Sequence, residues 1–98
     1  MGLNVEINGS GPDLVLLHGW GMNACVLDDL ATELAQRFRV HNVDLPGHGG
    51  SGACLPYTLD GIAAALAAAL PPRTIVCGWS LGGQVAFKWA LTAPAQIT

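Results

Sequence analysis

The most informative segment of the chain reads Thr74-Ile75-Val76-Cys77-Gly78-Trp79-Ser80-Leu81-Gly82. Its first four residues form a short apolar run typical of a buried strand, so we expect Cys77 to be buried. The last five residues place a glycine on each side of a Trp-Ser-Leu core, and a helical pattern follows. One apolar face of that pattern carries Val85, Ala86, Trp89 and Ala90. The stretch predicts a buried strand that turns sharply into a helix.

The rest of the chain alternates strand and helix patterns in the same way. Residues 3–7 alternate apolar and polar, as in a half-buried edge strand, whereas residues 14–17 and 40–43 are typical of core strands. Helical spacing covers residues 27–38, and Thr58 is placed to cap a helix that runs through Leu70. A loop rich in glycine and proline spans residues 45–56. This alternation predicts an α/β fold with a mostly parallel, doubly wound sheet and flanking helices.

The composition indicates the interior of a larger structure. Of 98 residues, 51% are apolar and only 11% are charged, against about 25% charged residues in average proteins. One domain is the most that this length allows. The chain has too few charges to cover the surface of a small globule.

Charge and sequence patterns exclude several functions. The net charge is −3 and the basic residues form no stripe, so no nucleic-acid partner is expected. The longest apolar run, residues 62–70, is far shorter than the roughly 20 residues of a membrane helix. The N-terminus lacks the blocks of a signal peptide, which predicts a cytoplasmic protein. Cys25, Cys54 and Cys77 have neither disulfide nor zinc-site spacing, and we expect neither a metal nor a cofactor.

Ser80 is the candidate nucleophile. Gly-x-Ser-x-Gly between a buried strand and a helix is the context of a nucleophile elbow, in which the serine backbone is strained. Gly78 and Gly82 are needed there because side chains would collide with neighbouring backbone. The N–H of Leu81, at the start of the helix, is suited to bind an oxyanion. The alternative is a tight strand-to-helix turn with an incidental N-cap serine.

A second loop, His18-Gly19-Trp20-Gly21, follows the strand at residues 14–17. We expect the backbone N–H of Trp20 to be the other oxyanion donor and its indole to line an acyl pocket; the alternative is a core aromatic. His18 is expected to brace this loop, together with Gly19, by hydrogen bonds. Asp44 is expected to accept N–H groups of its own loop. A rewired triad of Asp44 with His18 or His48 is a further alternative.

Three blocks carry a resemblance to the α/β-hydrolases: LVLLHGWGMNA at residues 14–24, VDLPGHG at 43–49 and GWSLGG at 78–83. Within that superfamily the first block is most similar to the pimeloyl-[acyl-carrier protein] methyl ester carboxylesterases of biotin synthesis. The resemblance implies a serine carboxylesterase with Ser80 as nucleophile and an acyl-serine intermediate. It further implies that Leu81 and Trp20 form the oxyanion hole, and that Trp20 contacts the substrate. The implied substrate is a small ester, short-chain or presented on acyl carrier protein.

The triad acid and base are missing from the chain. In this fold they follow the nucleophile, yet no Asp, Glu or His follows Ser80. The resemblance therefore implies that residues 1–98 are the N-terminal part of a single α/β-hydrolase domain, without its cap and C-terminal catalytic half. A serine without a positioned base is a poor nucleophile, so we do not expect these residues alone to catalyse efficiently.

Two other functional hypotheses remain open at this point. In the first, the chain is a non-catalytic truncated remnant or an interaction module. The strand that ends at Cys77 would then lack its next neighbour in the sheet, and its unpaired edge predicts aggregation. Alternatively, the same elbow supports another α/β-hydrolase activity, such as that of a thioesterase, a C–C bond hydrolase or a cofactor-free haloperoxidase.

Overall fold

The sheet is mostly parallel, as the strand and helix alternation predicts. In a computed structural model that describes residues 2–54 and 57–98, four strands lie in the order β1-β3-β2-β4. Strand β1 (Val5–Asn8) pairs antiparallel with β3 (Arg39–Val43), whereas β2 (Asp13–Leu17) pairs parallel with both β3 and β4 (Ile75–Gly78). The expected loop at 45–56 includes two positions, 55 and 56, that lie outside the described residues.

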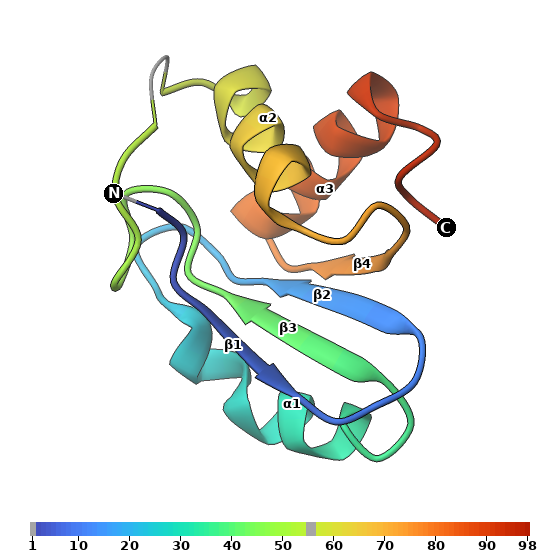
Figure 1. Cartoon of the computed structure of the whole chain (residues 1–98). Coiled ribbons are helices and arrows are strands. Elements are labelled where there is room, and N and C mark those ends of the chain that lie inside the picture. Colours follow the sequence, from blue (N-terminus) through green and yellow to red (C-terminus); the bar gives the residue numbers. More distant parts are fainter. Residues whose placement is uncertain (1, 55–56) are drawn as a thin grey trace.

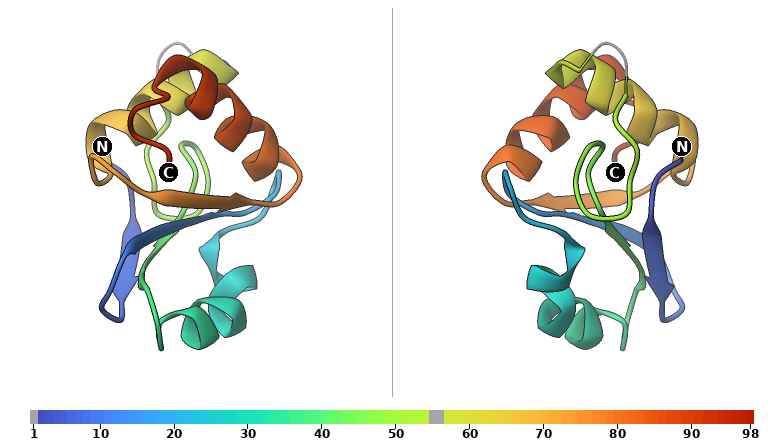
Figure 2. Two further views of the ribbon diagram at one scale, coloured as in Figure 1. Left: turned by 90° about the vertical axis from the view of Figure 1, so that its right-hand side faces the viewer. Right: turned by 90° about the vertical axis from the view of Figure 1, so that its left-hand side faces the viewer.

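Helices cover both faces of the sheet. The 3₁₀ turn η1 (Ala24–Leu27) and helix α1 (Asp28–Leu34) lie on one face, and α2 (Leu59–Ala69) and α3 (Leu81–Thr92) lie on the other (Figures 1 and 2). Successive side chains of β2 alternate between the two layers. Val15 and Leu17 enter the core under α2 and α3, whereas Leu14 and Leu16 pack toward α1. The doubly wound arrangement is confirmed.

The boundaries of the first two helices follow local signals to different degrees. Thr58 caps α2, because its hydroxyl accepts the Gly61 N–H at 3.0 Å, and α2 ends next to Leu70 as predicted. The helical pattern at 27–38 is realised only in part: α1 ends at Leu34, after a 3₁₀ turn capped by the Asn23 side chain. Leu30, within that pattern, is 43% exposed.

Helix α3 is held against the end of α2 by Trp89 and Gln96. Trp89 is fully buried, and its indole N–H donates to Gln96 Oε1 at 2.8 Å. The Gln96 amide in turn donates to the carbonyl oxygens of Ala67 at 3.1 Å and Pro71 at 2.9 Å. These bonds fix the helix whose first residues follow Ser80.

Strand β4 is an edge strand over residues 75–78, and Cys77 is exposed, so the prediction of a buried Cys77 is wrong. The physical reason is the position of β4 in the sheet, because β2 pairs with it on one side only. At the start of the strand, Thr74 forms a parallel bridge with Ile97, and the Thr98 N–H donates to the Thr74 carbonyl at 2.8 Å. The last residues of the chain therefore lie beside the beginning of β4.

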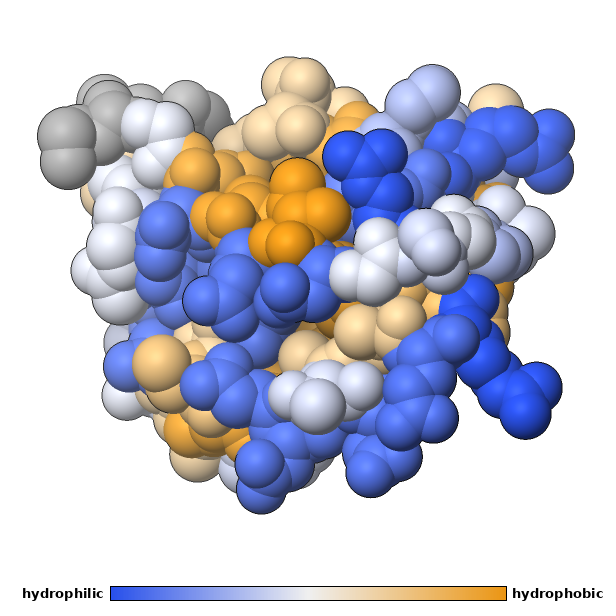
Figure 3. Space-filling view, turned by 60° about the horizontal axis from the view of Figure 1, so that its bottom comes forward, coloured by the Kyte–Doolittle hydropathy of each residue, from blue (hydrophilic) through white to orange (hydrophobic). Residues whose placement is uncertain are grey.

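Large apolar side chains reach the surface in several places. Trp20, Trp79, Phe87 and Leu91 are all more than half exposed, and Figure 3 shows apolar surface interrupting the polar surface on one face of the molecule. Across the described ranges 2–54 and 57–98, no helix is long and apolar enough to cross a membrane.

Candidate active site

Three loops meet at the carboxyl edge of the sheet because their strands are in register. Leu17, the last residue of β2, is paired with Val43 of β3 and with Gly78 of β4. The loops that begin at His18, at Asp44 and at Trp79 therefore leave the sheet side by side. In open α/β sheets this edge is where ligands bind.

Ser80 lies in the sharp turn between β4 and α3. Its backbone has φ 57° and ψ −115°, and among the described residues it is the only non-glycine with positive φ. Such a conformation costs about 1–3 kcal/mol and persists where the surroundings impose it. Ser80 occupies the N-cap position without a side-chain capping bond, so the hydroxyl is not used as a helix cap.

The glycines on either side of Ser80 allow the turn to close. A Cβ at Gly78 would collide with the backbone of Gly82, and a Cβ at Gly82 would collide with the carbonyl of Leu17. Helix α3 therefore begins in direct contact with the end of β2. This contact brings the turn at Ser80 against the loop that begins at His18.

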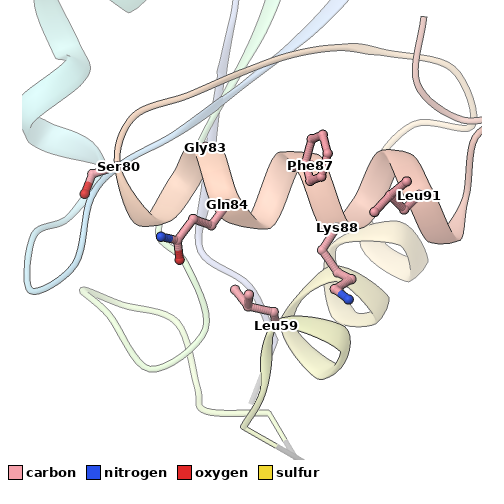
Figure 4. Close-up of a pocket in the computed structure, with 7 residues that line it drawn as sticks. All are labelled: Leu59, Ser80, Gly83, Gln84, Phe87, Lys88 and Leu91. Carbon is pink, nitrogen blue, oxygen red and sulfur yellow. The ribbon is translucent and has the colours of Figure 1, made fainter.

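An open pocket of about 570 Å³ runs from Ser80 along α3. Figure 4 shows Ser80 at one end, with side chains of α3 and the first residue of α2 along the rest. The apolar lining consists of Leu59, Phe87 and Leu91. Lys88 lies at the rim, where its ammonium group is 3.4 Å from the Asp60 carboxylate.

The loop at residues 18–21 lies next to Ser80. A Cβ at Gly19 would be 3.5 Å from the Ser80 Cβ, at ordinary van der Waals distance, so the loop passes directly beside Ser80. Trp20 is 66% exposed, which excludes its interpretation as a core aromatic. Its indole packs edge-on against the His48 ring, with ring centroids 5.2 Å apart.

His18 and His48 link this loop to the loop after β3. The Leu45 N–H donates to His18 Nε2 at 2.9 Å, and the Gly21 N–H donates to His48 Nε2 at 3.1 Å. Each Nε2 therefore carries a lone pair. The protons lie on the Nδ1 atoms, which face the carbonyl oxygens of Gly19 and Pro46 at 2.7 and 3.2 Å. Both rings are neutral in this arrangement.

Burial and hydrogen bonds set the protonation of His18 and Asp44. Burial lowers the pKa of His18, against the opposing effect of its bond to the Gly19 carbonyl. Burial of Asp44 opposes ionisation, but hydrogen bonds from Ala24, Asn4 and other donors outweigh it and lower the pKa of the carboxyl. The Ala24 N–H lies 2.7 Å from Oδ1, and the Asn4 amide lies 2.8 Å from Oδ2. Asp44 is thus an ionised acceptor for donors from three segments, of which only the Gly50 N–H, at 3.0 Å, belongs to its own loop.

No general base faces Ser80 in the part of the chain that the structure describes. Its hydroxyl forms no hydrogen bond with a histidine or a carboxylate there, and the Nε2 atoms of His18 and His48 already accept backbone N–H groups. Sequence reasoning missed the bond from Gly21 to His48. No local signal points to it, because the two residues meet only when β2 and β3 pair.

Comparison with known proteins places this geometry in a family. Residues 14–96 match the model of the Alpha/beta hydrolase family. The chain belongs to that family. The match includes the three loops at the carboxyl edge of the sheet and the turn that holds Ser80.

Curated relatives of this α/β-hydrolase chain are named as esterases. It is 53% identical over 95 residues to the pimeloyl-[acyl-carrier protein] methyl ester esterase of Nitrosomonas europaea, matching 97% of the chain and 38% of that protein. Identity to the esterase of the same name from Chromobacterium violaceum is 50%, over 99% of the chain and 38% of that protein. The chain therefore spans little more than a third of the length of these relatives.

Solved structures share the fold over the same part. Cfl2 from Burkholderia cenocepacia superposes with a TM-score of 0.91 at 29% identity, covering 97% of this chain and 35% of that one. A thermophilic esterase from Thermogutta terrifontis gives a TM-score of 0.87 at 29% identity, covering 97% of this chain and 37% of the other.

Proposed function

We propose that this chain is the N-terminal part of a serine carboxylesterase that hydrolyses the methyl ester of an acyl group carried on acyl carrier protein. The observation that carries the proposal is Ser80, held at φ 57° beside the loop of Gly19 and Trp20. A strained serine at a helix N-terminus, next to a second loop that can supply a backbone N–H, is the arrangement of acyl-transfer enzymes.

The chemistry assigned to Ser80 is attack of its Oγ on the ester carbonyl carbon. The Ser80 proton passes to a histidine outside these 98 residues, and the N–H groups of Leu81 and Trp20 bind the tetrahedral oxyanion. Collapse of this intermediate breaks the bond to the methoxy oxygen, which takes the proton back from the histidine and leaves as methanol, and an acyl-serine remains. Water then attacks the acyl-serine, which releases the carboxylic acid and restores the Ser80 hydroxyl.

The substrate is assigned from the relatives and from the pocket. Relatives at about 50% identity are named for a pimeloyl-[acyl-carrier protein] methyl ester. The open pocket at Ser80 has an apolar lining from Leu59, Phe87 and Leu91, which suits an aliphatic acyl chain. The expected cytoplasmic location, the lack of a cofactor and the lack of a nucleic-acid partner stay predictions.

The proposal that residues 1–98 form only part of a domain has three supports. The chain matches 38% of its relatives, no acid or histidine follows Ser80, and β4 has an open edge beside exposed Cys77. Because residues 97 and 98 already pair with Thr74, a continuing chain would begin the next parallel strand there. Such a strand would cover the exposed side of β4.

The decisive experiment replaces Ser80 in the full-length protein that contains this chain. We expect Ser80→Ala to lower the rate of methanol release from pimeloyl-[acyl-carrier protein] methyl ester by at least about 10³-fold. Ser10→Ala, in the exposed turn before β2, is the matched control and should keep full activity. A fluorophosphonate should add its mass to the peptide that holds Ser80. Undiminished turnover by Ser80→Ala would refute the proposal.

A further inference from the structure

The two peptide groups that flank Trp20 are each held by a histidine. Between Gly19 and Trp20, the carbonyl oxygen faces His18 Nδ1 at 2.7 Å. Between Trp20 and Gly21, the N–H donates to His48 Nε2 at 3.1 Å. Trp20 is thus fixed from both sides, although its own side chain is 66% exposed.

Because peptide groups are planar, these two hydrogen bonds set the orientation of the Trp20 N–H. The carbonyl of Gly19 and the N–H of Trp20 belong to one planar trans unit and point in opposite directions. The bond from His18 therefore sets the line along which the Trp20 N–H points. The bond from Gly21 to His48 prevents rotation of the next unit, which would otherwise carry Trp20 with it.

We propose that His48 is a positioning residue of the oxyanion hole, acting through Gly21 on the backbone N–H of Trp20. This inference rests on the proposed esterase function. His48 is suited to the role because it is itself fixed: it is 8% exposed, its Nδ1–H faces the Pro46 carbonyl at 3.2 Å, and the Trp20 indole packs against its ring. The Tyr57 hydroxyl also donates to the Pro46 carbonyl, at 3.2 Å.

The loop needs this support because little else holds it. Trp20, Gly21 and Met22 are all exposed, and Gly21 has φ +72°, a conformation that glycine shares with few residues. Within the loop, one backbone bond, from the Met22 N–H to the Gly19 carbonyl, measures 3.3 Å. A donor that is misplaced by about 1 Å can cost about 10²-fold in rate, so the anchor at Gly21 affects turnover.

Two amide variants of His48 separate its two contacts in the full-length protein. In His48→Gln the side-chain oxygen reaches the position of Nε2 and can accept the Gly21 N–H. In His48→Asn the shorter amide can donate to the Pro46 carbonyl but does not reach Gly21. We expect His48→Asn to lower kcat for the methyl ester by about 10- to 100-fold with KM changed less than about threefold, and His48→Gln to recover most of that loss.

His41→Gln is the matched control. His41 is also a buried histidine with a hydrogen bond, 2.8 Å to Asp13 Oδ1, but Asp13 begins β2 at the opposite end of the strand. Its replacement should lower the melting temperature without changing kcat. Amide hydrogen exchange at Gly21 gives a readout independent of turnover: it should accelerate at least about tenfold in His48→Asn and stay near the wild-type rate in His48→Gln.

The outcomes distinguish this inference from the proposed function. If Ser80→Ala abolishes activity but His48→Asn and His48→Gln have equal kcat values and equal exchange at Gly21, the role of His48 is overturned and the esterase stands. If Ser80→Ala leaves activity unchanged, the esterase and the oxyanion role of Trp20 both fall. Should His48→Asn not fold, His48→Phe, which keeps a ring against Trp20 but no acceptor, takes its place with the same expected loss.

Discussion

His18 and His48 each accept a backbone N–H from the loop that carries the other. His18, after β2, accepts the N–H of Leu45, and His48, after β3, accepts the N–H of Gly21, with the two ring centroids 5.1 Å apart. Two neutral side chains thus lock two loops by reciprocal bonds. Because both rings are nearly buried, water competes little for either hydrogen bond.

The stability of the full-length protein should depend on His18 staying neutral. Burial lowers the pKa of His18 in the folded state, whereas an unfolded histidine has a pKa of about 6.5. As the pH falls below about 6.5, the unfolded chain takes up a proton before the folded one, so the free energy of unfolding falls. Urea denaturation at pH 7.5, 6.5 and 5.5 should show this decline. His18→Gln should show a smaller decline; equal declines in both proteins would contradict the prediction.

The turn at Ser80 should not tolerate a methyl group at Gly82. A Cβ there would meet the Leu17 carbonyl, which is backbone within the sheet and cannot move aside. We expect Gly82→Ala to lower the free energy of unfolding by about 3 kcal/mol. Gly83→Ala is the control, because its Cβ would lie 3.4 Å from the nearest atom, the Gly78 carbonyl oxygen, and alanine favours a helix by up to about 1 kcal/mol. Chemical denaturation should separate the two; a Gly82→Ala variant as stable as Gly83→Ala would show that the turn relaxes.

The contact between α2 and α3 should depend on the Trp89 indole N–H as well as on its ring. Trp89→Phe keeps an aromatic ring but leaves Gln96 Oε1 without its donor at 2.8 Å, at an expected cost of about 1–3 kcal/mol. Trp89→Ala should cost about 3–5 kcal/mol. Phe87→Ala, on the same helix but 70% exposed, should change stability by less than about 0.5 kcal/mol. Thermal melts of the wild type and the three variants test this order. A loss of stability in Phe87→Ala as large as that in Trp89→Phe would refute it.

Much of the fold follows from local patterns. The apolar run at 14–17 is buried on both faces, with Leu14 and Leu16 on one side and Val15 and Leu17 on the other. Thr58 caps the helix that its position predicts. These features depend on the order of residues along a few turns or one strand, so the sequence contains all the information that they need.

Other features do not follow from local patterns. Cys77 has the apolar surroundings of a buried residue in the sequence, yet β4 is an edge strand and its thiol is exposed. The early end of α1 at Leu34 likewise does not follow from the helical spacing, which continues to Phe38. Periodicity describes which side of an element is apolar, but not what covers it.

The strained turn at Ser80 is encoded locally, because Gly78 and Gly82 permit a close approach that a residue with a Cβ would not allow. The reciprocal hydrogen bonds that His18 and His48 accept depend instead on the tertiary structure. The reason is that β2 pairs with β3, so residues 27 positions apart in the chain meet at one edge of the sheet. Such contacts form through the pairing of whole strands, and no short stretch of sequence encodes them.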